Sequence, residues 1–128
     1  MDVVRLDDMT TIVIFKSKNS YKGFTCMGHA GFGPAGSDIV CAAISILVIN
    51  TLNSIEELAG EKMITESDKE GCIECHFPDE INDKTKLLMD SMVMGLKEIE
   101  QNYGGKKSSF SARRSKKGHY FELIIKEV

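Results

Sequence analysis

The stretch that decides the fold is residues 10–27, TTIVIFKSKNSYKGFTCM. Its first part, Thr10 to Lys16, is an apolar run rich in β-branched residues, and its last part, Tyr21 to Met27, is a second run with strand character. Ser17 to Ser20, with the sequence SKNS, separate the two runs and are typical of a turn. The stretch therefore predicts a β-hairpin, and the other segments can be placed outward from it.

After the hairpin the sequence predicts a loop, a helix, a second hairpin, a second helix and a last strand. Residues 28–36 are rich in glycine and predict the loop, Ser37 is the predicted N-cap of the first helix, and Gly60 is its predicted stop. The further elements are expected at Lys62–Glu66, Gly71–Phe77, Ile81–Tyr103 and His119–Ile125. This β-β-α-β-β-α-β order predicts an α+β fold, with a mixed or antiparallel sheet and two helices packed on it.

Length and composition bound the class of protein. The 128 residues fit a single domain, and 42% hydrophobic with 27% charged residues excludes wholesale disorder. The longest nearly apolar run, Ile39 to Ile49, is shorter than the ~20 residues that span a bilayer, and the N-terminus carries acids where a signal peptide carries bases. We therefore expect a cytoplasmic protein without membrane contact, whose four cysteines are reduced.

The formal charge of −3 is unevenly distributed along the chain. Six basic residues and no acid lie in a segment at about 105–118: Lys106, Lys107, Arg113, Arg114, Lys116 and Lys117. The rest of the chain then holds 10 basic and 19 acidic residues, which is not typical of a dedicated nucleic-acid-binding domain. We interpret the segment as a solvated basic loop, with a weak contact to RNA as the alternative.

The most informative chemistry lies between the first hairpin and the first helix. His29 follows the second strand, and Cys41 is expected about one turn inside the helix. A helix N-terminus and a nearby imidazolium both lower the pKa of a cysteine from ~8.5, and the free amides at a helix start can hold an oxyanion, the amide of Cys41 among them. The alternative is that Cys41 is a small buried hydrophobe and His29 is structural.

At these residues the sequence resembles the ribosomal-processing cysteine proteases, often called Prp. The string GHA, the glycine-rich stretch and the string DIVCAAIS carry the resemblance, which is most specific over residues 28–45 and weaker over about 11–104. It implies a Cys41 nucleophile and a His29 general base, with Asp38 and Ser45 in supporting roles and with no cofactor or metal. The loop residues expected to close over the substrate are Gly31, Phe32, Gly33 and Gly36.

The resemblance also implies a substrate and an assembly. Members of the family remove an N-terminal extension from the large-subunit ribosomal protein numbered twenty-seven, cutting after a pair of aromatic residues and before a small one. They are homodimers, which would account for the apolar first half of the first helix. Chains of the family are expected to finish soon after the second helix, so the basic segment at 105–118 is interpreted as an insert, with docking on ribosomal RNA as one possible use.

Two other classes compete with the protease. A zinc-binding structural module could use Cys26, His29, Cys72 and Cys75, whose spacing suits zinc, although a separation of three places the last two on opposite faces of a strand. The CxxCH spelling at residues 72–76 also matches c-type haem attachment, which belongs to exported proteins and is rejected because no export signal is seen. A non-catalytic ribosome-assembly or RNA-binding adaptor would act through the basic segment.

Overall fold

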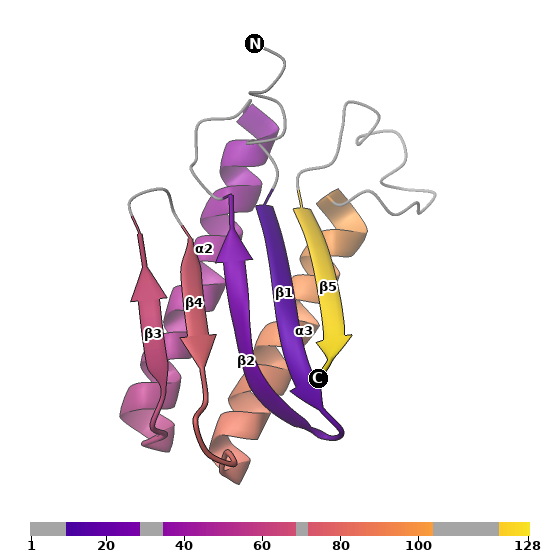
Figure 1. The fold of residues 1–128 in the computed structure, drawn as a ribbon. Coiled ribbons are helices and arrows are strands. Elements are labelled where there is room, and N and C mark those ends of the chain that lie inside the picture. The colour runs from indigo at the N-terminus through magenta and orange to yellow at the C-terminus, as the bar shows by residue number, and fades with distance from the viewer. Residues whose placement is uncertain (1–9, 29–34, 69–71, 104–120) are drawn as a thin grey trace.

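The computed structural model describes residues 10–28, 35–68, 72–103 and 121–128, which are coloured in Figure 1. Of residues 35–38 and Tyr103 it describes the backbone alone. The expectations for His29, for the loop residues Gly31, Phe32 and Gly33, and for the basic segment therefore lie outside the described residues.

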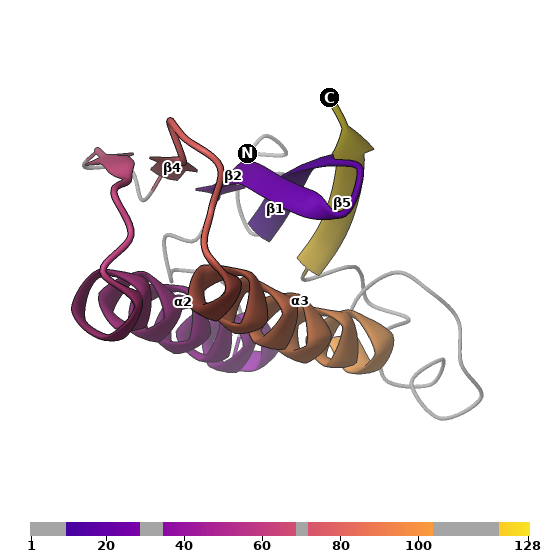
Figure 2. The same cartoon turned by 90° about the horizontal axis from the view of Figure 1, so that it is seen from below.

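A five-stranded sheet in the order β3-β4-β2-β1-β5 forms one layer. The strands are β1 (Thr10–Ser17), β2 (Ser20–Met27), β3 (Ile64–Ser67), β4 (Ile73–His76) and β5 (Phe121–Glu127). All neighbouring strands are antiparallel except β1 and β5, which are parallel, so the sheet is mixed. The helices α2 (Ala35–Ser54) and α3 (Asp83–Tyr103) lie side by side on one face of it (Figure 2). The predicted α+β architecture is confirmed.

The first hairpin has a tighter turn than the sequence suggested. Ser17 pairs with Ser20, so only Lys18 and Asn19 connect β1 to β2, and Lys18 takes a φ of 57°. Two-residue connections with positive φ match the twist of the strands they join, which explains the short turn. Along β1 the alternate side chains of Thr10, Ile12 and Ile14 are fully buried under the helices.

The first helix begins earlier than predicted. It starts at Ala35, so Ser37 lies within its first turn and is not the N-cap, and Gly36 belongs to the helix and not to the loop. The sequence has a proline at position 34, and a proline at or just before the first turn is a start signal that the capping argument overlooked. After Ser54 the helix continues as a π-helical turn, η1 (Ile55–Ala59), and ends at Gly60, whose left-handed φ of 64° confirms the predicted stop.

Only one side of α2 is covered by the rest of the described chain. Val40, Ile44 and Val48 face the sheet and are buried, whereas Ile39 and Ile46 are 66% and 69% exposed. By length and hydropathy the described segment Ile39–Ala59 could also span a membrane. The apolar run in the sequence is shorter than this segment, because the run ends before Asn50. The core helix of a soluble protein can pass the same test, and this helix forms much of the core.

The second hairpin and the second helix appear with boundaries shifted by one or two residues. The helix α3 begins at Asp83 because Asn82 caps it, its Oδ1 accepting a hydrogen bond of 2.8 Å from the amide of Thr85. Glu61 fixes this start from outside, since its Oε1 accepts from the amide of Asn82 and from the hydroxyl of Thr85. Gly95 lets α3 approach α2, because a Cβ there would lie 2.9 Å from Cδ2 of Leu47.

Candidate active site

Cys41 lies where α2 crosses the end of the central strands. Figure 1 shows the beginning of α2 at the same end of the sheet as the start of β1 and the end of β2. The side chain of Cys41 is 6% exposed and faces the sheet, in the row that also holds Val40 and Ile44. The sulfur is therefore held between helix and sheet, and not at a free surface.

The sulfur of Cys41 lies close to a polar group, the hydroxyl of Thr10. The two atoms lie 3.4 Å apart, in a fully buried contact between residues 31 positions apart in the sequence. The same hydroxyl also donates a hydrogen bond of 3.4 Å to the carbonyl oxygen of Gly28. Thr10 thus connects Cys41 to the residue that directly precedes His29 in the sequence.

Sequence reasoning missed Thr10. A signal for it was present, because Thr10, Ile12 and Ile14 alternate along the first strand, and a hydroxyl in such an apolar row needs a partner. What the sequence could not supply is the partner, since the contact with Cys41 depends on how α2 crosses β1.

Of the other predicted site residues, Ser45 is placed in full. It lies one helical turn after Cys41 on α2, as the spacing of four residues predicts. The residue is half-buried. Asp38 lies on the first turns of α2, and its side chain is outside the described residues, as His29 is. The described residues therefore do not test the contact between His29 and Cys41, and the pair stays a prediction.

The early start of α2 corrects the expected oxyanion donor. In an α-helix the first four amides lack an intrahelical partner, and each later amide bonds to the carbonyl four residues before it. Because the helix begins at Ala35, Cys41 is its seventh residue and its amide lies within the hydrogen-bonded part. The amides that remain for an oxyanion are those of residues 35–38.

The other three thiols have environments that suppress the thiolate. Burial raises the pKa of Cys26 to about 12, with smaller contributions from Cys72 and Cys41, and burial raises the pKa of Cys75 to about 12. Burial and then the carboxylates of Asp68 and Glu74 raise the pKa of Cys72. Since the thiolate is the nucleophile, these three cysteines are poor candidates for catalysis.

The described residues do not support the zinc module. Cys75 points into the core, where its Sγ lies 3.9 Å from Sδ of Met63, while Cys72 is only half-buried just before β4. Within the described ranges no three His, Cys, Asp or Glu side chains come together in a way that could hold a metal ion. The fourth predicted ligand, His29, is outside these ranges.

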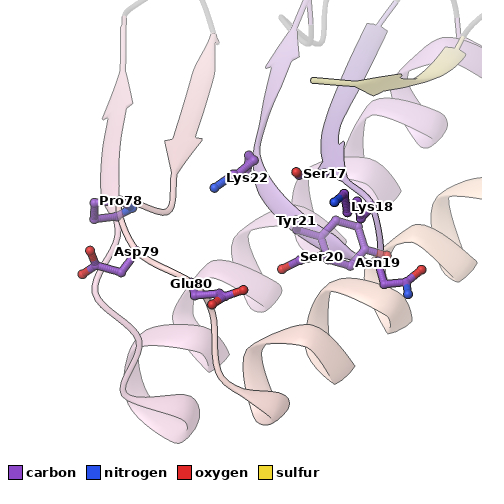
Figure 3. Close-up of a pocket in the computed structure, with 9 residues that line it drawn as sticks. All are labelled: Ser17, Lys18, Asn19, Ser20, Tyr21, Lys22, Pro78, Asp79 and Glu80. Carbon is purple, nitrogen blue, oxygen red and sulfur yellow. The ribbon is translucent and has the colours of Figure 1, made fainter.

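A cavity of about 610 Å³ lies at the opposite end of the sheet from Cys41 (Figures 1 and 3). It lies between the β1–β2 turn and the segment that leads from β4 to α3, and it is lined by Ser17, Lys18, Asn19, Ser20, Tyr21, Lys22, Pro78, Asp79 and Glu80. The lining has charges of both signs and no cysteine or histidine, so this cavity does not offer the chemistry of a thiol protease.

The chain is similar to known proteins over most of its length. The family model described as Cysteine protease Prp matches residues 9–107, a range that contains both His29 and Cys41. Ribosomal processing cysteine protease Prp of Bacillus subtilis (strain 168) is 33% identical over 85 residues, which are 62% of this chain and 76% of that protein.

Two solved structures of the essential ribosomal processing protease Prp from S. aureus have the same fold. The complex with a substrate peptide aligns with a TM-score of 0.73 at 24% identity, over 92% of this chain and 100% of that one. The complex with a covalently linked product peptide aligns with a TM-score of 0.71 at 25% identity, over the same shares. These alignments extend past the end of α3 at Tyr103, so the expectation that related chains finish soon after the second helix is wrong for these neighbours.

Proposed function

The chain belongs to the Prp family of cysteine proteases, and from this premise we propose that it is an endopeptidase that processes a ribosomal protein with Cys41 as its nucleophile. The observation that carries the residue assignment is the placement of the Cys41 sulfur. It lies 3.4 Å from the hydroxyl of Thr10, which also reaches the carbonyl of Gly28, directly before His29. Thr10, Gly28 and Cys41 thereby meet at one end of the sheet, and His29 is the next residue in the sequence after Gly28.

In the proposed reaction His29 takes the proton of Cys41, and the thiolate attacks the carbonyl carbon of the scissile peptide bond. The carbonyl oxygen takes up the negative charge near the free amides at the start of α2. His29 then gives its proton to the leaving amine as the C–N bond breaks, which leaves a thioester on Cys41. Water, deprotonated by His29, attacks the thioester and releases the new C-terminal carboxylate and the thiol.

The S. aureus neighbour with a covalently linked product peptide supports this route, because a covalent enzyme-bound species is what nucleophilic catalysis requires. The poor nucleophilicity of the other thiols supports it from within this chain, since Cys26, Cys72 and Cys75 all have raised pKa values.

As the substrate we propose the precursor of the large-subunit ribosomal protein numbered twenty-seven, cut after paired aromatic residues and before a small one. The names of the relatives support a ribosomal substrate, and the S. aureus complex shows that a protein of this fold binds a peptide. The proposal places the reaction in the cytoplasm, where ribosomal proteins are made. The loop that includes Phe32 would cover the bound peptide.

The substrate is tested with the precursor protein and mass spectrometry of the products. We expect a single cut after the aromatic pair, and we expect a precursor with both aromatic residues replaced by alanine to stay intact. Equal cleavage of both precursors, or cuts at scattered positions, would contradict the proposed specificity.

We further propose that the chain acts as a homodimer through the outer face of α2. Ile39, Ile46 and Ile49 are 66%, 69% and 46% exposed and lie on the side of the helix that faces away from the sheet. A second copy that covers this stripe would stabilise the dimer by about 25 cal/mol for each Å² of apolar surface that it removes from water. The same patch on both chains suits a two-fold interface.

A further inference from the structure

Thr10 is a polar residue in an apolar position. It is the first residue of β1, its exposed fraction is 0%, and the next two side chains on the same face of the strand are Ile12 and Ile14. A valine would fill the same volume without the cost of burying a hydroxyl, which is high when the group lacks a partner. The hydroxyl of Thr10 is therefore explained by what it contacts.

Its two contacts differ in quality, although both measure 3.4 Å. An O–H···O bond usually has a donor–acceptor distance of about 2.5–3.0 Å, so the bond to the carbonyl of Gly28 is long and weak. Sulfur is a larger atom, and 3.4 Å between the hydroxyl oxygen and Sγ of Cys41 is an ordinary hydrogen-bond distance. The stronger partner of the hydroxyl is thus the sulfur of Cys41.

The single proton of the hydroxyl gives the contact a direction that depends on the state of Cys41. While Cys41 is a thiol, its S–H can donate to the Thr10 oxygen, and the hydroxyl proton can point to the carbonyl of Gly28. A thiolate can only accept, so the hydroxyl proton then turns to the sulfur. Hydrogen bonds to an ionised acceptor are about twice as strong as neutral ones, and this one favours the thiolate.

We infer that Thr10 is a positioning residue for the nucleophile, which holds the sulfur of Cys41 beside the end of β2 and donates to it in the thiolate state. The inference rests on the proposed role of Cys41 as nucleophile. It adds a residue outside the GHA and DIVC strings, from an element that precedes both of them in the chain. Because Gly28 directly precedes His29, the same hydroxyl also links the nucleophile to the backbone that carries the base.

The test compares Thr10→Val, which removes the hydroxyl at constant volume, with Thr10→Ser, which keeps it. The kcat and KM for cleavage of the precursor peptide are measured on the full chain, together with the rate at which iodoacetamide alkylates Cys41. We expect Thr10→Val to lower kcat by about tenfold to a hundredfold, as the loss of a hydrogen bond to a charged group does, with KM changed less than about twofold. Alkylation should slow by a similar factor, and Thr10→Ser should restore most of both rates.

Thr51→Val is the matched control. Thr51 is also buried, at 5% exposed, and its hydroxyl donates to the carbonyl of Leu47 on the same helix and not to Cys41. We expect this variant to keep the wild-type kcat and the wild-type alkylation rate. A structural effect of removing any buried threonine hydroxyl would lower the activity of both variants alike.

Wild-type kcat and alkylation in Thr10→Val, or a Thr10→Ser variant as slow as Thr10→Val, would overturn the inference. If Thr10→Val loses its folded circular dichroism spectrum, Thr10→Ala is measured in its place with the same expectation. A Cys41→Ala variant that still cleaved the peptide would defeat the proposed function itself. An inactive Cys41→Ala beside a fully active Thr10→Val would defeat only the role of Thr10.

Discussion

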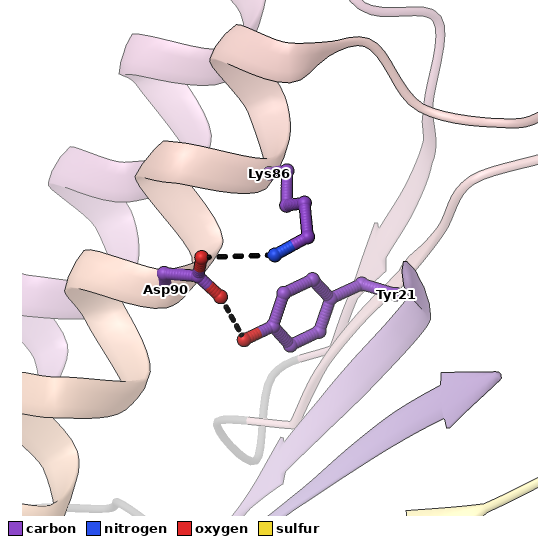
Figure 4. A network of polar contacts seen from close by, with 3 residues as sticks. All are labelled: Tyr21, Lys86 and Asp90. Atoms are coloured by element: carbon purple, nitrogen blue, oxygen red, sulfur yellow. Dashed lines mark hydrogen bonds and ion pairs between the residues drawn. The ribbon is translucent and has the colours of Figure 1, made fainter. Parts of the chain in front are cut away.

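The hydroxyl of Tyr21 donates a hydrogen bond of 2.6 Å to Oδ1 of Asp90, and this contact joins β2 to α3 (Figure 4). The ring of Tyr21 is buried, with 3% of the residue exposed, while the other carboxylate oxygen of Asp90 binds the ammonium of Lys86 at 3.1 Å. The sheet and the helix layer are thus connected by a charge-assisted bond at the end of the sheet away from Cys41.

Removing the hydroxyl of Tyr21 should destabilise the fold. We expect Tyr21→Phe to lower the free energy of unfolding by about 1–2 kcal/mol, because a hydrogen bond to a charged group is lost at a buried position. Lys86→Ala is the control, since the side chains of Lys86 and Asp90 are 42% and 46% exposed and such surface pairs contribute less than about 0.5 kcal/mol. Urea unfolding gives both values, and equal losses would contradict the account.

The same contact should make stability depend on pH at both ends of the range. The hydrogen bond from Tyr21, and next Lys86, lower the pKa of Asp90. The contribution of Asp90 to the stability of the fold is therefore present above pH ~4 and is lost as the pH falls through the lowered pKa. Burial, and next Asp90, raise the pKa of Tyr21. The contribution of Tyr21 to the stability of the fold is therefore present below pH ~10 and is lost as the pH rises above that value through the raised pKa. We expect the stability difference between wild type and Tyr21→Phe to be largest between these limits, and a difference independent of pH would refute this.

Gly23 is required by a close approach between β2 and β4. A Cβ at this position would lie 2.2 Å from the carbonyl oxygen of Cys75, a backbone atom that cannot move away without disturbing the sheet. We expect Gly23→Ala to lower the free energy of unfolding by about 1–3 kcal/mol or more.

Gly60→Ala provides the comparison for Gly23→Ala. Gly60 has a left-handed φ of 64° and open space around it, so alanine there should cost only about 1–2 kcal/mol for the backbone conformation. Thermal unfolding ranks the two variants, and a Gly60→Ala variant less stable than Gly23→Ala would show that the approach to Cys75 is not the reason for the glycine.

The exposed isoleucines of α2 predict the effect of a charge on assembly. Ile46 is 69% exposed on the outer face of the helix. We expect Ile46→Glu to shift the chain from dimer to monomer, because the substitution would bury a charge in an apolar interface. The matched control is Ile64→Glu, which changes a residue 53% exposed on β3 in the sheet layer. Sedimentation measurements distinguish the cases, and a wild-type chain that is already monomeric would remove the dimer from the account.

The order of the elements could be predicted because hydrophobic periodicity and glycine or turn residues are local signals. Gly60 ended the first helix as predicted, and the apolar run that begins at Thr10 is a strand, as its β-branched residues predicted. Helix starts were less secure, because several residues near one another can act as the start. Ser37 has a side chain suited to a cap although the helix begins at Ala35, and Asn82, which does cap α3, lies inside the range expected to be helical.

The site was predictable only in part, for a physical reason. The sequence singles out His29 after a strand and Cys41 near a helix start, and the resemblance carried by short strings adds Asp38 and Ser45. The contact between Thr10 and Cys41 spans 31 positions and arises from the way α2 crosses β1, which no local pattern encodes. Even the choice of oxyanion amides depended on where α2 begins, so an error of three residues at the helix start changed it.

The most direct test of the central claim is cleavage of the extended ribosomal-protein precursor, followed by mass spectrometry, with wild type, Cys41→Ala, His29→Ala and Cys72→Ser compared at equal concentration. The account predicts one cut with wild type, cleavage close to the wild-type rate with Cys72→Ser, and no cut with either Cys41→Ala or His29→Ala, although both should keep the wild-type fold by circular dichroism. A Cys41→Ala variant that still makes the same cut would contradict the assignment of Cys41 as the nucleophile.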